Sequence, residues 1–477
     1  MAANAYRRGR FRLATNWLAM LGALTLLASG CGARWSPDQE LRVSADKQQG
    51  LTGESAPDAA LEPGTSSTVG DTGGAISSLS GGGLSGNSST PSGARSTGPT
   101  GSASRVDAGP HPGVTDTEIT LCVLVPLTGA APIPTNWKDG ANLYWDHLRE
   151  RGGVHGRNVK LNIKDTKSDT ATALAEARNC ISEQSFTFLT FDRTAIGATV
   201  SKFLNGKGIP NVIVQGPATP DMDTGSDQVN TFAINIDHRE QPRIVAEYFT
   251  TGDLASKRER VGIVRENNPD AERDVEVAKP WFSQKGIKVV VEEVIDEQGN
   301  DYTANVLRLM NAKAELVWFD GAPTPMIKLA QQAFAAGYHP TWFGYSVSWS
   351  FETVAQIGNA NGAMNGARAF SSWVALSSPA AGTYKAAYRE TYPNQTPDDI
   401  GLMGWAFGEV MHAGLQAAGR QLGYNTFRSA FQSLDVTPQT WAPLHFGPGV
   451  RVGTHSIVEF RIDGTHWDQV GTFRSAF

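Results

Sequence analysis

The most constraining feature of the sequence is a run of apolar and β-branched residues, Ile119-Thr-Leu-Cys-Val-Leu-Val125, that leads into a segment with helical periodicity. The run has almost no polar position and ends at Pro126, as expected of a strand that is buried on both faces of a parallel sheet. In residues 136–151 apolar side chains recur every three or four positions, which predicts an amphipathic helix. A second strand is expected at residues 159–163. Together the three segments predict a β-α-β unit.

The same alternation continues along the chain and predicts an α/β fold with two successive parallel-sheet lobes. After about residue 370 the pattern returns to helices before it ends in short strands, which suggests that the chain crosses between the lobes several times. Further strands are expected at residues 186–190, 211–214, 231–234, 261–264, 288–291, 316–319, 342–344, 367–370, 444–446, 457–462 and 467–470. Further helices are expected at residues 170–183, 195–204, 241–249, 271–282, 302–310, 326–336, 380–391 and 402–418.

The N-terminal segment has the plan of an export signal. Several arginines precede an apolar run from about Leu13 to Leu27, which stops at Ala28-Ser-Gly-Cys31. The small residues before Cys31 resemble a lipobox, although Ala28 stands where that motif has Leu. We therefore expect residues 1–30 to be a signal peptide and Cys31 to carry a lipid that holds the protein on the extracytoplasmic face of the cell membrane. A secreted protein that is cut elsewhere, or a retained anchor, is the alternative.

Residues 31–113 have the composition of a tether. Between residues 51 and 110, 38 of 60 residues are Gly, Ser, Thr or Pro. Such a stretch cannot bury enough apolar surface to offset chain entropy, so we expect disorder.

Loss of the signal peptide removes four Arg and no acid, and the formal charge moves from −6 to −10. This mildly acidic balance gives no electrostatic reason to expect nucleic-acid binding.

Two cysteines remain if Cys31 is lipidated, and they form an even pair in an oxidising compartment. Cys122 lies in the first strand. Cys180 lies near the end of the second helix, which in a right-handed crossover passes across that strand. A disulfide between them is therefore geometrically reasonable, and two separate buried thiols are the alternative.

The order of the segments resembles the branched-chain amino-acid-binding family of type I periplasmic binding proteins, the receptors of ABC importers. The resemblance runs from about Val114 to Gly471. Each motif alone is weakly specific, and the assignment depends on their order and spacing. The motifs are Val125-Pro-Leu-Thr-Gly129, Gly152-Gly153 with Gly156-Arg157, Asp165, Pro217-Ala-Thr219, Val317-Trp-Phe-Asp-Gly321, the segment from Gln331 to Gly337 and the aromatic hairpin near Trp467.

This resemblance implies a Venus-flytrap architecture, in which two doubly wound lobes joined by a multi-stranded hinge close on a small polar solute. Residues 114–477 would form the binding domain, with lobe 1 at about residues 114–237 and 369–445 and lobe 2 at about residues 238–368 and 446–477. The implied function is a receptor that delivers an amino acid, amide or organic acid to ABC permease and ATPase subunits. The alternative is a ligand-sensing domain that works with a membrane signalling protein.

In lobe 1 the resemblance implies a site at loops that follow strands, where helix N-termini offer free N–H groups to a carboxylate. Thr194 begins a helix where the family places a hydroxyl against the ligand carboxylate, and Ala218 and Thr219 match the family's loop of small residues. Thr128 is a further candidate, and Asp237 lies near the hinge, where the family has an acidic contact. Alternatively, the hydroxyls only cap their helices.

Lobe 2 departs from the family. Its first loop carries Asn267 and Asn268, where the family commonly has a Tyr-Gly pair, and Tyr345 and Ser346 stand where amino-acid binders have a glutamate. Without that glutamate a buried ammonium group lacks its obvious partner. An α-amino acid is therefore in doubt as the ligand, and a neutral amide, an acid or a ring-bearing metabolite is the alternative.

Four other side chains have two interpretations. Glu266 and Asp320 could supply the missing carboxylate, but charged residues beside a Gly turn are expected to be solvated. Trp137 and Trp405 could contact the solute, or they could pack in the core, which is the commoner fate of a tryptophan in a helix.

The sequence has no motif for catalysis. It contains no His-Glu-x-x-His, Walker-type lysine loop, paired-cysteine metal signature or Gly-x-Ser-x-Gly. The nine His residues have no metal-ligand spacing. We therefore expect a monomeric binding protein that is not an enzyme and needs neither a cofactor nor a metal.

Overall fold

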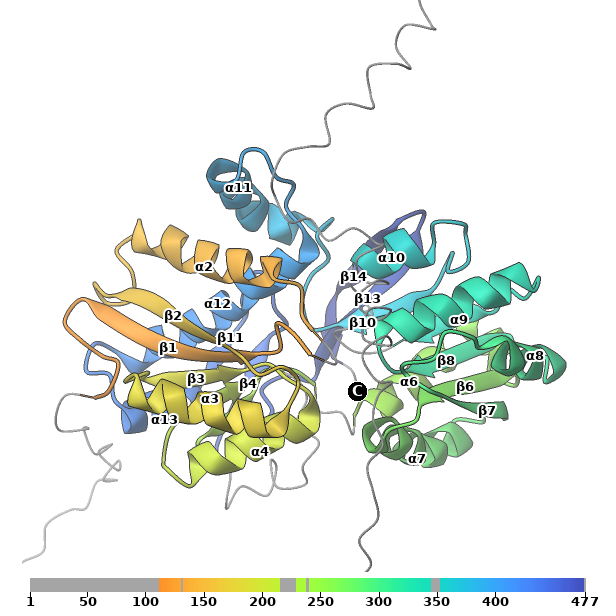
Figure 1. The fold of residues 1–477 in the computed structure, drawn as a ribbon, viewed down its shortest axis with the longest axis horizontal. Coiled ribbons are helices and arrows are strands. Elements are labelled where there is room, and N and C mark those ends of the chain that lie inside the picture. Colours follow the sequence, from red (N-terminus) through yellow and green to blue (C-terminus); the bar gives the residue numbers. More distant parts are fainter. Residues whose placement is uncertain (1–110, 130–131, 215–228, 237–239, 345–351, 476–477) are drawn as a thin grey trace, which may run out of the picture. The chain divides into compact units, whose positions relative to one another are not determined.

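The computed structural model describes residues 111–129, 132–214, 229–236, 240–344 and 352–475. In this part of the chain, strands and helices alternate and build two α/β lobes, each around a largely parallel sheet (Figure 1). The fold class expected from the sequence is therefore confirmed. The expectations for the signal peptide, Cys31 and nearly all of the tether lie outside the described residues.

Lobe 1 is built on five parallel strands in the order β2-β1-β3-β4-β5. In β1, Leu121 and Val123 belong to one hydrophobic cluster, whereas Cys122 and Leu124 belong to another, because successive side chains point to opposite faces. Both faces of β1 are therefore buried, as its apolar run predicts. The strands are β1 (Glu118–Val125), β2 (Asn158–Asp165), β3 (Thr187–Thr190), β4 (Asn211–Ile213) and β5 (Thr231–Ala233).

Helices cover the two faces of this sheet. The face of Cys122 packs against α3 (Thr170–Ser182) and α4 (Thr194–Asn205). The opposite face packs against α2 (Asn136–Arg149), α12 (Asp399–Ala418) and α13 (Tyr424–Phe431), and α11 (Gly382–Thr391) packs against α2. The sequence pattern did not predict α13.

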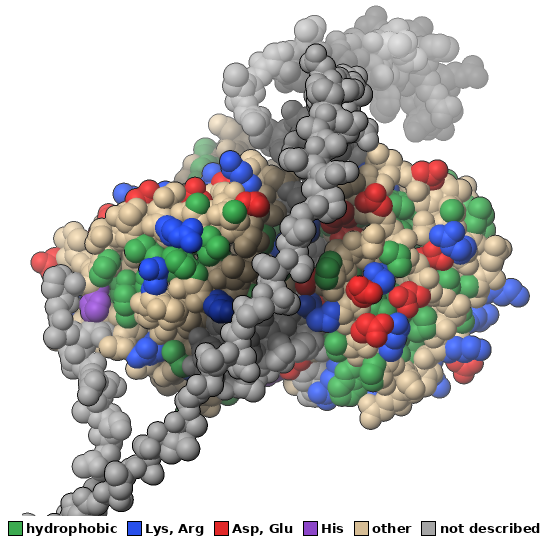
Figure 2. Space-filling view, turned by 60° about the horizontal axis from the view of Figure 1, so that its bottom comes forward, with side chains coloured by type: hydrophobic (Ala, Val, Ile, Leu, Met, Phe, Trp, Pro, Cys, Tyr) green, Lys and Arg blue, Asp and Glu red, His purple; other side chains and the backbone are tan. Residues whose placement is uncertain are grey.

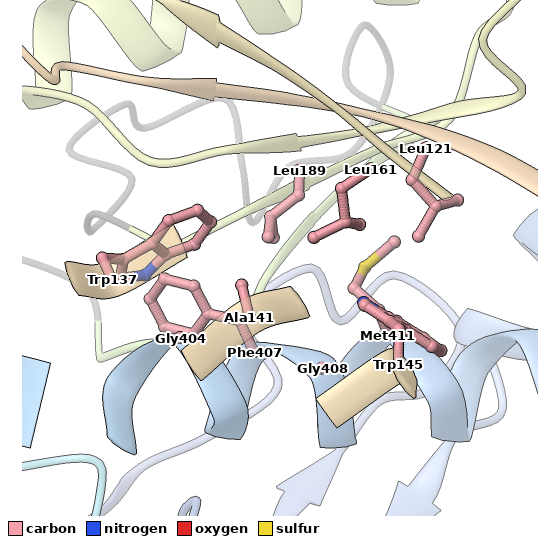
Figure 3. Close-up of a pocket in the computed structure, with 10 residues that line it drawn as sticks. All are labelled: Leu121, Trp137, Ala141, Trp145, Leu161, Leu189, Gly404, Phe407, Gly408 and Met411. Atoms are coloured by element: carbon pink, nitrogen blue, oxygen red, sulfur yellow. The ribbon is translucent and has the colours of Figure 1, made fainter. Parts of the chain in front are cut away.

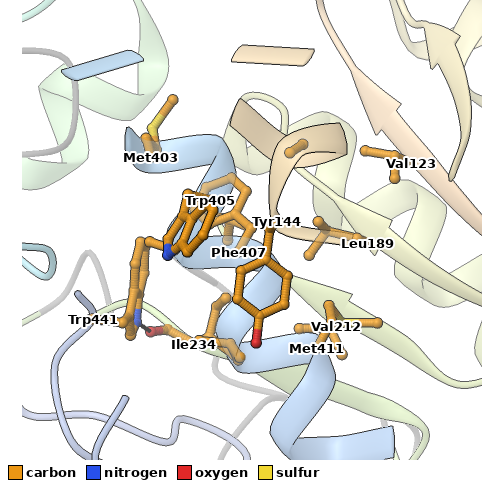
Figure 4. Close-up of a cluster of buried hydrophobic side chains, with 14 of the residues drawn as sticks. Val123, Tyr144, Leu189, Val212, Ile234, Met403, Trp405, Phe407, Met411 and Trp441 are labelled. Carbon is orange, nitrogen blue, oxygen red and sulfur yellow. Dashed lines mark hydrogen bonds between the residues drawn. The ribbon is translucent and has the colours of Figure 1, made fainter. Parts of the chain in front are cut away.

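The largest core cluster lies between the sheet and helices α2 and α12. Figure 4 shows Tyr144 of α2 among Trp405, Phe407 and Met411 of α12. The ring nitrogen Nε1 of Trp441 donates a hydrogen bond of 2.7 Å to the carbonyl oxygen of Ile234, the residue that follows β5 (Figure 4). This bond satisfies the one polar atom of a fully buried indole.

A disulfide joins Cys122 of β1 to Cys180 of α3, with the two Cα atoms 5.9 Å apart. Both residues are fully buried. The bridge ties a helix to the sheet that it covers.

Lobe 2 has a seven-stranded sheet in the order β14-β13-β10-β9-β8-β6-β7. The strands from β10 to β7 are parallel, and the C-terminal hairpin adds two antiparallel strands at the edge of β10. The strands are β6 (Val261–Glu266), β7 (Val289–Ile295), β8 (Leu316–Asp320), β9 (Thr341–Gly344), β10 (Arg368–Ser371), β13 (Ser456–Asp463) and β14 (His466–Ser475).

Two layers of helices cover this sheet as well. One face packs against α6 (Gln241–Phe249) and α7 (Pro269–Gln284), whose apolar side chains form a cluster with Ile263 and Trp318. The other face packs against α8 (Thr303–Asn311), α9 (Pro323–Ala335) and α10 (Glu352–Gly358).

Three stretches of chain connect the lobes: they follow β5, β10 and β12 (Leu444–His445), which pairs with β11 (Asp435–Val436). The third stretch hydrogen-bonds to the end of β5: the N–H of Ala233 donates to the carbonyl of Arg451, and its carbonyl accepts from the N–H of Gly453, both at 2.8 Å. The domain boundaries stay a prediction. The boundary expected after residue 368 falls inside β10, all of which pairs within the sheet of lobe 2.

Candidate functional site

The topology of lobe 1 points to the loops that follow β1 and β3. These strands are neighbours in the sheet. The chain runs from β1 to β2 on one side and from β3 to β4 on the other side, so the two connections lead in opposite directions. In doubly wound sheets the carboxyl ends of such strands form the crevice where ligands bind. Thr128 follows β1, and Thr194 begins α4 after β3, so the fold brings two of the predicted residues to this switch point.

Thr194 has the properties of a ligand-binding hydroxyl. It is 7% exposed and is the first residue of α4. Within the described part of the chain its hydroxyl has no hydrogen-bond partner. The preceding residue, Arg193, provides no side-chain cap, so the N–H groups of the first turn are left without a capping oxygen. A buried hydroxyl and a positive helix end together suit an anionic oxygen atom.

Thr128 instead holds its own loop. Its side chain is exposed, and its hydroxyl donates a hydrogen bond of 2.6 Å to Asp165 Oδ2 at the end of β2. Asp165 Oδ1 accepts from the N–H groups of Leu127, Thr128 and Lys167 at 2.9, 3.1 and 3.0 Å. Burial opposes ionisation, but these hydrogen bonds outweigh it and keep the pKa of Asp165 below its usual value. The carboxylate therefore fixes the loop after β1.

In lobe 2, Asn268 has a structural partner for each end of its carboxamide. Its oxygen Oδ1 accepts a hydrogen bond of 2.9 Å from the N–H of Ala271 and so caps α7. Its nitrogen Nδ2 donates to Glu266 Oε2 at 3.1 Å. Asn267 is exposed. Asn268 thus positions the loop after β6, whereas the side chain of Asn267 is exposed to solvent.

The expectation that Glu266 and Asp320 are solvated is wrong. They are 4% and 7% exposed. The reason is that β6 and β8 extend further than the apolar runs that predicted them. The parallel ladder places Glu266 beside Ile295 of β7 and places Asp320 beside Arg265 of β6, so each acid is the last residue of a paired strand.

Trp137 and Trp405 both lie in the core of lobe 1, at 0% and 2% exposure. Trp137 borders a small cavity, together with Leu121, Leu189 and Met411 (Figure 3). The cavity has a volume of about 10 Å³, roughly the space of one water molecule. It is lined by apolar side chains and is too small for a solute, so it belongs to the core rather than to a binding site.

Five predicted site residues lie outside the described residues: Ala218, Thr219, Asp237, Tyr345 and Ser346. Their roles stay predictions.

Two charged residues near the switch point of lobe 1, Arg193 and Glu297, were not among the predicted site residues. The guanidinium nitrogen Nη2 of Arg193 lies 3.5 Å from Glu297 Oε2 in the loop that follows β7. The placement of Arg193 directly before Thr194 was a usable signal, because that loop follows a buried strand. Glu297 lies in a polar turn, and its sequence context gives no signal.

On the face shown in Figure 2, acidic and basic side chains are interspersed. No described helix is long and apolar enough to cross a membrane. Among the described residues, no group of three or more His, Cys, Asp or Glu is placed to hold a metal ion.

Comparison with known protein families finds one that covers most of the chain. The model of a family described as periplasmic binding protein matches residues 118–465. A curated relative, the Leu/Ile/Val-binding protein homolog 3 of Brucella melitensis biotype 1, is 25% identical over 222 residues. That alignment covers 46% of this chain and 59% of the relative, so this chain matches well under two thirds of the relative's length.

Solved structures share the fold at lower sequence identity. A branched-chain amino acid ABC transporter protein from Thermus thermophilus with bound valine aligns with a TM-score of 0.66 and 15% identity, over 76% of this chain and 97% of that chain. A fatty acid ABC transporter substrate-binding protein from Thermomonospora curvata aligns with a TM-score of 0.65 and 18% identity, over 76% of this chain and 94% of that chain.

Proposed function

This chain belongs to the periplasmic binding protein family, a class of solute-binding proteins rather than of enzymes, and from that premise we propose that it is the extracytoplasmic receptor of an ABC importer. The names of the related proteins support this role, since two of them are described as ABC transporter proteins and one as a homolog of Leu/Ile/Val-binding proteins. The two lobes would close on the solute, and the loaded receptor would deliver it to permease and ATPase subunits in the membrane.

The solute that we propose carries a carboxylate. Valine, bound to the Thermus protein, and the fatty acids in the name of the Thermomonospora protein share that group. In this chain, the observation that carries the proposal is the start of α4, where the buried hydroxyl of Thr194 lacks a partner among the described residues and lies beside free N–H groups. A carboxylate would satisfy all of these donors.

Thr219, Ala218, Asp237, Tyr345 and Ser346 are proposed as further contacts of the solute. They follow strands or lie near the hinge, where the family's binding loops are found. The same proposal places Cys31 at the membrane, with residues 31–113 as the tether between the lipid and a monomeric binding domain.

Isothermal titration calorimetry of the purified protein tests the role of Thr194. In Thr194→Ala, loss of a hydrogen bond to a charged group should weaken binding of L-leucine or L-valine by about 10- to 100-fold. The matched control is Thr199→Ala on the same helix, because the hydroxyl of Thr199 already donates to the carbonyl of Ala195 at 2.9 Å. The control should bind as the unchanged protein does. Equal affinities in the two variants would contradict a site at the start of α4.

A further inference from the structure

Arg451 lies in the third stretch that connects the lobes, beside the outermost strand of the sheet of lobe 1. Its backbone is fixed there, because its carbonyl oxygen accepts a hydrogen bond of 2.8 Å from the N–H of Ala233 in β5. In the order of the sheet, β4 and β5 separate this position from β3 and from the start of α4 that follows β3. Arg451 therefore lies apart from the proposed solute site at Thr194.

The side chain of Arg451 is buried. Only 4% of the residue is exposed, and its guanidinium carbon Cζ lies 5.5 Å from the centre of the Phe232 ring. Phe232 is itself fully buried, and its ring packs against those of Phe431 and Phe446, with centres 5.1 and 5.7 Å apart. The charged group therefore faces an aromatic cluster rather than water on this side.

Two nitrogen atoms of this guanidinium lack hydrogen-bond partners. Nε and Nη1 of Arg451 are buried, and neither donates a hydrogen bond to any residue that the structure describes. The contact with Phe232 offsets part of the cost of burying the charge, but it leaves these N–H donors unsatisfied. A buried donor without a partner is costly, more so when it carries charge. Such atoms call for an explanation, and a bound ion is one.

No described carboxylate neutralises the charge of Arg451. Two acids beside the connecting stretch are engaged elsewhere. Asp435 Oδ1 lies 2.8 Å from His445 Nδ1, and Glu240 Oε2 lies 2.9 Å from His455 Nδ1. Burial lowers the pKa of Arg451 below its usual value, whereas a carboxylate close to the guanidinium would raise it.

Arg428 of α13 adds a second positive charge near the amino end of β5. Its Nη1 donates a hydrogen bond of 3.1 Å to Oδ1 of Asn230, which directly precedes β5, and its Nη2 donates to Oδ1 of Asn425. Both acceptors are neutral amides. Two arginines thus lie around this end of β5, and neither forms an ion pair with an acid in the described part of the chain.

We propose that Arg451 is the centre of a binding site for a small oxyanion with more than one negative charge, of the sulfate or phosphate class. The planar fork of N–H donors in a guanidinium matches the oxygens of such an anion, and the charge of Arg428 favours a multiply charged ligand. The bound anion satisfies the free donors of Arg451 and holds the third connecting stretch against lobe 1. This site is separate from the solute site and does not depend on the proposed transport role.

Thermal unfolding of the full protein in millimolar sodium sulfate, with the ionic strength held constant by sodium chloride, tests the site. The unchanged protein is compared with Arg451→Met, in which an apolar side chain replaces the buried charge. Such replacements are commonly tolerated, so this variant should fold. At about ten times its Kd, sulfate should raise the Tm of the unchanged protein by about 2–4 °C more than that of Arg451→Met.

Arg178→Met is the matched control. The Cζ atom of Arg178 also lies over a phenylalanine ring, 5.2 Å from the centre of Phe203 in α4, but Arg178 is exposed, so water can satisfy its donors. This variant should respond to sulfate as the unchanged protein does. Sulfate also stabilises proteins in general because it is excluded from their surface, and this effect cancels in the comparison of the three proteins.

A crystal of the unchanged protein grown with sodium selenate gives a second readout that needs no variant. The anomalous scattering of selenium should place a peak within about 5 Å of Cζ of Arg451, as expected when selenate oxygens accept hydrogen bonds from the guanidinium. Equal Tm shifts in the unchanged protein and Arg451→Met would overturn the inference, and so would a selenate crystal without this peak. A sulfate response that Arg178→Met also loses would count against it, because the response would then not belong to Arg451.

Discussion

The substitution Gly404→Ala should force α12 away from α2, because the two helices pack closely at this glycine. A Cβ atom there would lie 2.2 Å from the carbonyl oxygen of Trp137 and 2.8 Å from the amide nitrogen of Ala141. Both are backbone atoms of α2, which cannot rotate away, so α12 has to move by about 1 Å to restore an ordinary contact. Such overpacking costs about 1–3 kcal/mol.

Alanine also favours the helix by about 1 kcal/mol over glycine, which offsets part of this cost. At a contact as close as 2.2 Å we expect the upper part of the overpacking range, and hence a net loss of about 2 kcal/mol in the free energy of unfolding of Gly404→Ala. Urea denaturation followed by tryptophan fluorescence measures this loss.

Gly197 provides the matched control within a helix of the same lobe. A Cβ atom on Gly197 would meet no atom within 4 Å, so Gly197→Ala should gain up to about 1 kcal/mol of stability from helix propensity alone. The prediction is a difference in sign between two identical substitutions. If Gly404→Ala were as stable as the unchanged protein, or if both variants lost stability equally, the close packing of α2 on α12 would be refuted.

Three further predictions concern stability. Reduction of the Cys122–Cys180 bridge, which spans 58 residues, should lower the free energy of unfolding by about 4 kcal/mol, and an unchanged urea midpoint in dithiothreitol would contradict this. Asp165→Ala should cost about 2 kcal/mol, because several N–H groups lose their acceptor, whereas a loss below about 0.5 kcal/mol would argue against its role in the loop. Burial raises the pKa of Asp399 to about 8, above its value of about 4 in the unfolded chain, so the folded state keeps a proton that the unfolded state has lost. The free energy of unfolding should therefore fall between about pH 4 and pH 8. Urea unfolding at several pH values should show a smaller fall for Asp399→Asn than for the unchanged protein.

The sequence was most informative where a pattern is local. The apolar run of β1 and the periodicity of α2 predicted both elements within a few residues, because burial on two faces and on one face leave different periods. For α12 the apolar periodicity begins only at residue 402, but the acid pair Asp398-Asp399 is itself a helix-start signal. The helix begins at Asp399, and the carboxylate of Asp398 caps it by accepting a hydrogen bond of 2.7 Å from the N–H of Gly401.

Elements whose stability depends on tertiary packing could not be read from the sequence. Helix α13 has eight residues, too few for a clear periodic pattern in the sequence, and it is stabilised by the burial of Phe427 and Phe431 in the core of lobe 1. Strand β14 runs to Ser475 instead of ending at Val470, because β13 supplies a partner along most of its length.

The residues of the candidate site also differ in how far local sequence could predict them. A helix start near Thr194 could be predicted from local signals, because the helical pattern follows a buried strand. The role of Thr194 as a ligand contact came from the family resemblance and stays a prediction. The burial of Glu266 could not be predicted, because it depends on β8, on the missing Cβ of Gly321 and on the N–H of Ala322. Gly321 and Ala322 lie more than 50 residues after Glu266 in the chain, and they come close to it only when the sheet forms.

The most direct test of the central claim is a crystal structure of the protein with L-leucine bound. We predict a carboxylate oxygen at about 3 Å from the hydroxyl of Thr194 and from N–H groups in the first turn of α4. A solute whose carboxylate lies elsewhere, with the hydroxyl of Thr194 bonded to the protein itself, would contradict it.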